Sequence, residues 1–166
     1  MRLGNTPAIQ GQSKYAIKDN TGVGLFKGNP CALEDSSGSQ GFLQDMAFDT
    51  TDDTGAGGND YASGTDSKLL GVFNGAFFVD NNTSKPTFAN SVAAGQRFAT
   101  NPNTGSTNGI GFVNDDPFQE YVIKADAAVT QANHGQCGNV NDFAAGDAKD
   151  GQSTTTLDIG ALAEDH

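Results

Sequence analysis

The apolar residues of this chain come in short islands, and residues that favour turns bound each island. The first islands span residues 15–17, 23–27 and 31–33, with turn-forming residues at 19–22 and 28–30 between them. Runs of this length separated by Gly, Asn, Asp and Pro are typical of β-strands joined by turns. No window keeps a 3.6-residue apolar period, so helix is expected to be a minor element. The sequence therefore predicts an all-β fold, a single small barrel or sandwich of short strands with long loops rich in Gly, Asp, Asn and Thr.

The strongest strand signal lies at residues 69–80, which are mostly aliphatic and aromatic but include Gly71 and Gly75. Each glycine would cost a helix about 1 kcal/mol relative to alanine. Glycine suits a strand that bends sharply, as strands do at the corners of a barrel. We expect a turn at 81–86 to follow, and a returning strand to begin at 87–90.

A second clear strand is predicted at residues 118–124, after a turn at 115–117. Its side chains are expected to alternate between two faces, with Tyr121, Ile123 and Ala125 on one and Glu120, Val122 and Lys124 on the other. Asp115 and Asp116 are interpreted as turn residues that cap their own backbone before Pro117. The alternative, a pair of catalytic carboxylates, is disfavoured because neighbours on an extended chain point to opposite faces.

The length of 166 residues predicts one domain at 13–166, preceded by an N-terminal arm at 1–12. Residues 34–68 are rich in Gly, Ser, Thr and Asp, and they are expected to form a long loop or excursion with one short strand at most. Val, Ile, Leu and Phe together make up only 32 of the 166 residues, whereas glycine contributes 22. Such a chain buries a thin core, so we expect a partner to complete it.

The formal net charge of −11 excludes most nucleic-acid binders, because contacts with phosphates need a basic surface. It also argues against docking on an anionic membrane. No apolar run approaches the roughly 20 residues that a membrane-spanning helix needs, and the first residues lack the apolar stretch of a secretory signal. We therefore expect neither a nucleic acid nor a membrane as a partner.

Two cysteines and one internal histidine are the candidates for reactive chemistry. Cys31 and Cys137 are too far apart in sequence for a metal motif, and two free, mostly buried thiols are expected, with a single long-range disulfide as the alternative. His134 lies three residues before Cys137, a spacing that admits a nucleophile and its base. Nothing else in the chain supports this pair, so a histidine in a turn is the preferred interpretation.

The chain does not contain residues at the spacing that known metal-binding and cofactor-binding motifs require. Residues 49–60 resemble the start of a calcium loop, but Thr51 and Thr54 stand where an EF-hand needs an acid and a glycine. No nucleophile elbow, phosphate-binding loop, dinucleotide fingerprint or zinc-protease motif is present. We therefore expect no catalytic, cofactor-binding or metal-binding residues, and no enzymatic activity.

Three segments together carry a resemblance to a known family: residues 24–30, residues 70–80, and the turn at 115–117 leading into 120–126. They resemble small structural proteins of tailed bacteriophages, especially phages of marine and freshwater hosts. The family resembled is that of capsid decoration, or cement, proteins. The resemblance implies a β-rich virion protein, bound as a homo-trimer to the outer surface of the major capsid protein shell.

Residues that contact the partner are expected in the arm and in the strongest strand. The expected contact residues are Arg2, Leu3 and Ile9 in the arm and Phe78 in the strand. Phe77 and Phe78 face opposite ways in a strand, so one can pack in the core while the other meets a neighbouring subunit. Burial of both in the core is the alternative.

The rival to a decoration protein is a tail, head-fibre or vertex adhesion module that binds a host-surface receptor or glycan. Glycan binders usually display exposed Trp or Tyr platforms. This chain has no Trp and only 3 Tyr, which counts against that alternative.

Overall fold

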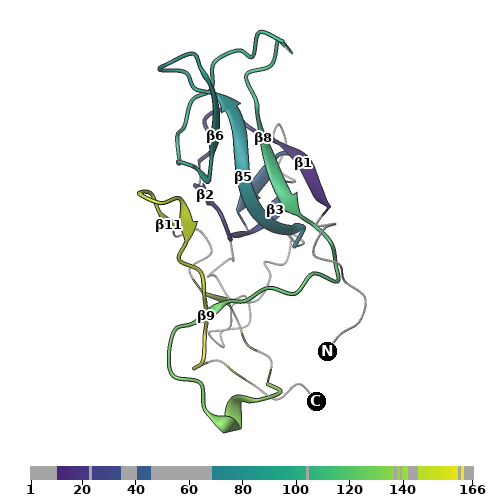
Figure 1. Cartoon of the computed structure of the whole chain (residues 1–166), viewed down its shortest axis with the longest axis vertical. Coiled ribbons are helices and arrows are strands. Elements are labelled where there is room, and N and C mark those ends of the chain that lie inside the picture. Colours follow the sequence, from purple (N-terminus) through teal and green to yellow (C-terminus); the bar gives the residue numbers. More distant parts are fainter. Residues whose placement is uncertain are drawn as a thin grey trace, which may run out of the picture.

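The computed structural model of the chain describes residues 11–22, 24–34, 41–45, 69–103, 105–136, 138, 140–141, 146–160 and 162. These residues form thirteen β-strands and one short 3-10 helix, Gln131–Asn133 (Figure 1). The predicted all-β class is therefore confirmed. Within these ranges no helix has the length and apolar character needed to cross a bilayer.

One six-stranded antiparallel sheet dominates the fold (Figure 1). Five strands follow the order β1 (Gln12–Ile17), β8 (Gly109–Asn114), β5 (Gly71–Val79), β3 (Pro30–Leu33) and β4 (Leu43–Asp45), and β6 (Pro86–Ala89) also pairs with β5. The two end strands, β1 and β4, contact each other without pairing, so the sheet curls but does not close into a barrel.

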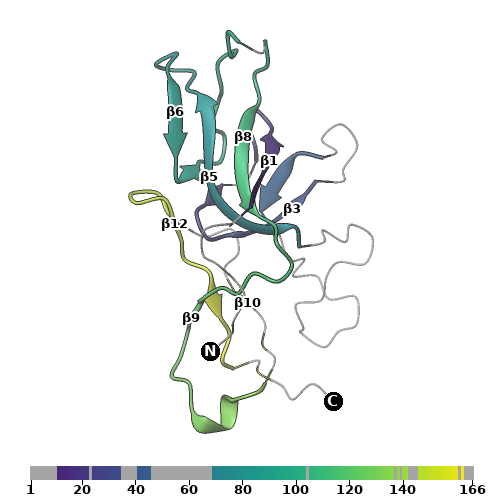
Figure 2. The same cartoon turned by 45° about the vertical axis from the view of Figure 1, so that its right-hand side comes forward.

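Strand β5 pairs with three other strands of this sheet, and each of its two glycines is required for a different structural reason. At Gly75 the backbone φ is 129°, in the region that favours glycine, and Asn74 is the extra residue of a bulge in the pairing with β8. At Gly71 the main-chain carbonyl of Asn114 comes too close to leave room for a Cβ atom. The bend predicted from these glycines is confirmed, and Figure 2 shows the curvature of β5. The predicted returning strand is also confirmed, as β6.

The core lies on the inner face of the curled sheet. A short ribbon made of β2 (Leu25–Phe26) and β7 (Ser91–Val92) packs across this face. The buried cluster consists of Ile17, Leu25, Cys31, Leu43, Phe73, Ala76, Phe78, Val92, Phe98 and Val113. At the centre Ile17 and Leu43, from the two end strands, pack over Gly111 of β8. Large side chains are few, as the composition predicts.

A second, smaller part follows β8 in the chain. It contains the three-stranded sheet β10 (Val140–Asn141), β13 (Thr156–Leu157) and β9 (Lys124–Ala125), and the hairpin β11 (Gly146–Asp147) with β12 (Gln152–Ser153). The hairpin lies against β2, where the ring of Phe26 covers Gly146. Figure 2 shows β9 and its neighbours as an extension beyond the main sheet.

The predicted strand at residues 118–124 is wrong. Residues 119–123 belong to no strand, and only Lys124 of that range pairs, as the first residue of β9. The strand in this region is β8, which precedes the turn at 115–117. Its apolar alternation was hidden because Gly109 and Gly111 occupy two of its inward positions.

The predicted domain limits fall partly outside the described residues. Of the arm at 1–12, residues 1–10 lie outside them, and Gln12 is already paired with Asn114 at the start of β1. Of the excursion at 34–68, the structure describes 34 and 41–45, and β4 is the short strand within it.

Candidate functional site

The outer face of the main sheet carries a row of apolar side chains that crosses four strands. Ala16 of β1 is opposite Ile110 of β8, Ile110 is opposite Phe77 of β5, and Phe77 is opposite Phe88 of β6. Directly paired residues share one face of a sheet, so these four side chains form a line, here called the outer row. The rings of Phe77 and Phe88 are 4.7 Å apart between centroids, and 76% of Phe88 is exposed.

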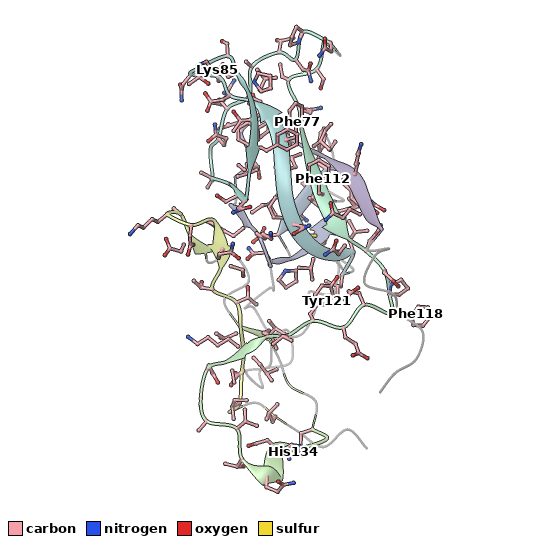
Figure 3. The ribbon with its side chains drawn as sticks, in the orientation of Figure 1. Phe77, Lys85, Phe112, Phe118, Tyr121 and His134 are labelled. Carbon is pink, nitrogen blue, oxygen red and sulfur yellow. The ribbon has the colours of Figure 1, made fainter. Side chains whose placement is uncertain are left out.

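The strands beneath the outer row are almost free of charge. Strands β1, β5, β6 and β8 contain a single charged residue, Lys14, and no carboxylate, although the whole chain has a net charge of −11. Phe112 lies on the same face, beside Lys14 and Gly75 in the register. Figure 3 shows Phe77 and Phe112 on the neighbouring strands β5 and β8. Aromatic enrichment and depletion of charge are characteristic of the centre of a protein–protein interface.

A groove of about 300 Å³ runs along the outer row. Its floor includes Ala16, Phe77 and Ile110, and its rim includes Asn101 and Asn108 from the loop before β8. A backbone hydrogen bond closes this loop, in which the Asn101 N–H donates to the Ser106 carbonyl at 2.8 Å. The face therefore combines an apolar floor with a polar, largely uncharged rim.

The structure reassigns the aromatic contact residue in β5. Phe78 is only 6% exposed and packs in the core against Phe98, with ring centroids 4.8 Å apart. The choice of Phe78 as a surface contact is therefore wrong, and Phe77 is the aromatic residue on the outer face. The alternation of sides was predictable, but the bulge at Asn74 decides which residue of the pair faces outward. The other expected contacts, Arg2, Leu3 and Ile9, lie outside the described residues.

The cysteine and histidine candidates do not form a reactive centre in the described part of the chain. Cys31 is a buried free thiol, which confirms the expectation for this residue, and Cys137 lies outside the described residues. Burial, and secondarily the charge of Asp115, raises the pKa of the Cys31 thiol to about 12. A thiol with such a pKa is a poor nucleophile at neutral pH. His134 is exposed in a turn after the 3-10 helix, as expected (Figure 3).

Asp116 caps the turn that was predicted, whereas Asp115 binds a side chain of β1. The Asp116 side chain accepts a hydrogen bond from the backbone N–H of Phe118 at 2.9 Å, and Asp115 accepts one from the Tyr15 hydroxyl at 2.8 Å. Hydrogen bonds from Ser13 and Tyr15 lower the pKa of Asp115. The two carboxylates therefore serve different partners and do not converge on one substrate.

Metal ligation was the other chemistry tested. The stretch at 49–60 that resembles a calcium loop lies outside the described residues. Among those that are described, no three His, Cys, Asp or Glu side chains gather into a group that could hold a metal ion.

One unusual side chain has no signal in the sequence. Asp45, the last residue of β4, is opposite Cys31 and only 1% exposed, and within the part of the chain that the structure describes neither carboxylate oxygen has a hydrogen-bond partner. Burial raises the pKa of this carboxyl from 3.8 to about 6. An unpaired buried carboxylate is costly to the fold.

The outer row can bind an apolar protein surface, and the groove beside it can hold an extended or ring-shaped group. Comparison of the chain with protein-family models, with curated proteins and with solved structures finds no match.

Proposed function

We propose that this chain is a capsid decoration protein of a tailed bacteriophage. It binds the outer surface of the major capsid protein shell and stabilises the particle, and it acts as a structural protein and not as an enzyme. Its partners are the major capsid protein and further copies of itself, as a homo-trimer. The segments that resemble decoration proteins and the properties of the outer face support this proposal.

The observation that carries the proposal is the separation of charge from the outer row. The four strands beneath that row contain no carboxylate, whereas the chain as a whole has 20 acidic residues. A face without negative charge can approach a protein shell closely. Acidic groups on the remaining surface keep the outer layer of a particle soluble and away from packaged DNA.

The thin core supports the same proposal. A domain with few large apolar residues gains stability when a partner covers its exposed apolar surface. A contact of about 1,000 Å² is enough for specific attachment. Repeated over many copies, such contacts add up to a large stabilisation of the shell against the pressure of packed DNA.

The Phe88→Ser variant tests the outer row directly. We expect its dissociation constant for shells stripped of the protein to rise about tenfold or more, because an exposed aromatic residue that a partner buries is a frequent hot spot. The fold should keep its stability to within about 0.5 kcal/mol, since Phe88 is largely exposed. Binding can be measured by co-sedimentation with the shells.

Val129→Ser is the control, because Val129 is 57% exposed and lies both off the outer row and outside residues 118–126. Equal binding by the Phe88→Ser variant and the unmodified chain would contradict the role of the outer row. Equal losses in both variants would show that general hydrophobicity, and not this face, is responsible.

Copy number separates decoration from other virion roles. Mass spectrometry of intact particles can count this chain against the main shell protein. We expect a near-integer ratio that corresponds to hundreds of copies. A dozen copies or fewer would instead indicate a tail or vertex component.

The second candidate function is adhesion to a host-surface glycan, and the groove along the outer row is the observation that favours it. Phe77 on its floor offers a ring for stacking, and Asn101 and Asn108 on its rim carry amide groups that hydrogen-bond sugars. Titration with soluble oligosaccharides from host envelopes tests this candidate. Saturable binding that is lost in Phe77→Ser would favour adhesion over decoration.

A further inference from the structure

The segment between β8 and β9 has the sequence of a strand but no partner strand among the described residues. Residues 119–123 lie in no strand or helix, and Figure 2 shows them in a drawn-out connection from the end of β8 to β9. The contacts at its start include a hydrogen bond from the Phe118 N–H to Asp116 and one from the Tyr121 hydroxyl to the Asn114 carbonyl at 2.9 Å, and Glu120 also has an interaction partner.

Apolar side chains of this segment face solvent. Val122 is fully exposed and Phe118 is 76% exposed. Tyr121 and Ile123 are 47% and 39% exposed (Figure 3 labels Phe118 and Tyr121). β-Branched and aromatic residues are those that a strand prefers. Residues 121–124 share the lining of a cavity of about 330 Å³ with Pro30, Val72 and Val140. Val122 nevertheless stays fully exposed, and exposed residues of these types at a sheet edge mark a surface that another chain covers.

The segment also continues an open sheet edge. In the three-stranded sheet the order is β10, β13, β9, so, as far as the described ranges go, β9 is an edge strand with one side unpaired. Residues 118–123 run directly into β9 at Lys124. A strand from another molecule can therefore pair along β9 and along the segment before it in one continuous addition.

We propose that residues 118–126 pair with the same residues of a second copy of this chain, antiparallel about a two-fold axis at Val122. In this register Val122 is opposite its own counterpart, and Tyr121 is opposite Ile123 on the other face. Glu120 is opposite Lys124 twice, once on each side of the axis. The two three-stranded sheets then join into one sheet of six strands across the axis.

The segment is complementary to itself, so a second copy of this chain is the partner that fits it. An isologous contact needs each residue to match its symmetry partner, and this segment places an acid and a base at equal distances from Val122. Parallel pairing in register would put Glu120 against Glu120. An antiparallel register centred on Tyr121 would leave Lys124 opposite Phe118. Of these registers, the Val122 register alone pairs Glu120 with Lys124 and Tyr121 with Ile123, and at its two ends it leaves Phe118 opposite Asp126.

This contact does not rest on the proposed function and uses no residue of the outer row. A copy attached to a shell through Phe77 and Phe88 can make it at the same time. It would then link copies that belong to neighbouring trimers.

A cysteine at the axis gives the sharpest test. Directly opposed residues in an antiparallel pair have Cα atoms about 4.5–5.5 Å apart, within the range that a disulfide spans. In a full-length chain carrying Cys137→Ser, we expect Val122→Cys to form a disulfide-linked dimer under mild oxidation. Val129→Cys, exposed but outside the segment, should stay largely unlinked. Non-reducing electrophoresis distinguishes them, and equal linkage in both or none in Val122→Cys would overturn the proposal.

Charge exchange tests the register without a covalent bond. Glu120→Lys should raise the dimer dissociation constant about tenfold or more, because both cross-strand pairs become repulsive. Adding Lys124→Glu to the same chain should restore the affinity of the unmodified protein. Analytical ultracentrifugation measures each constant. No dimer in the unmodified chain, or a double variant as weak as the single one, would overturn the two-fold pairing even if attachment to shells is intact.

Discussion

Replacing Gly71 by alanine should lower the free energy of unfolding by about 2–3 kcal/mol, the usual cost of forcing an extra group into a packed site. A Cβ atom at this position would overlap the main-chain carbonyl oxygen of Asn114 and would lie 2.8 Å from Cγ1 of Val113. A backbone carbonyl cannot rotate away as the end of a side chain can. Relief therefore requires β5 and β8, the central pair of the sheet, to separate at this end.

Urea unfolding followed by circular dichroism measures this loss. Gly22→Ala is the matched control, because nothing lies within 4 Å of a Cβ atom at Gly22 and its φ is not in the region reserved for glycine. We expect the control to change stability by about 0.5 kcal/mol or less. If Gly71→Ala behaves like Gly22→Ala, the close approach of the two strands at this point is wrong.

The second large effect is a gain of stability on replacing Asp45 by asparagine, and the gain depends on pH. The buried carboxyl has a pKa raised to about 6, against 3.8 when it is exposed. A tenfold change in an acid dissociation constant corresponds to about 1.36 kcal/mol, so ionisation of Asp45 costs the fold about 3 kcal/mol. The amide of the Asp45→Asn variant carries no charge at any pH and avoids this cost.

The direction of the pH effect follows from which state binds the proton. Below about pH 4 the Asp45 carboxyl is protonated in both the folded and the unfolded chain, and it imposes no electrostatic penalty. As the pH rises from about 4 to 6, the unfolded chain ionises first, so the stability of the unmodified protein falls. Above about pH 6 the full penalty persists.

The measurement is the difference in unfolding free energy between Asp45→Asn and the unmodified protein at pH 3.5 and pH 8. We expect that difference to change by about 3 kcal/mol in favour of the variant at the higher pH. Asp116→Asn removes the same charge from an exposed position and controls for the net charge of −11. A difference that stays constant with pH would show that Asp45 is not ionised at a cost in the fold.

Local patterns predicted those features that depend on neighbours in the chain. The turns predicted at 81–86 and 115–117 are found at residues 81–83 and 117–118, and the apolar run with two glycines is a bent strand. The all-β class followed from the same patterns, because short apolar islands between turn residues cannot build long helices.

Pairing between distant segments escaped prediction. Residues 118–124 have the better strand sequence, but β8 is the strand because it fits between β1 and β5 and its Gly111 leaves room for Ile17 and Leu43. The outward side of Phe77 likewise depends on a bulge against β8. The burial of Asp45 depends on where β4 docks, which its own sequence does not indicate.

The amino-acid sequence by itself determined that this chain is built of short strands, carries a strong negative charge and buries few large side chains, since composition and local spacing are properties of the chain alone. The tertiary structure alone decided which face is left uncovered and where charge is missing from it. That choice is made by register, because one step along a strand exchanges the buried side for the exposed one.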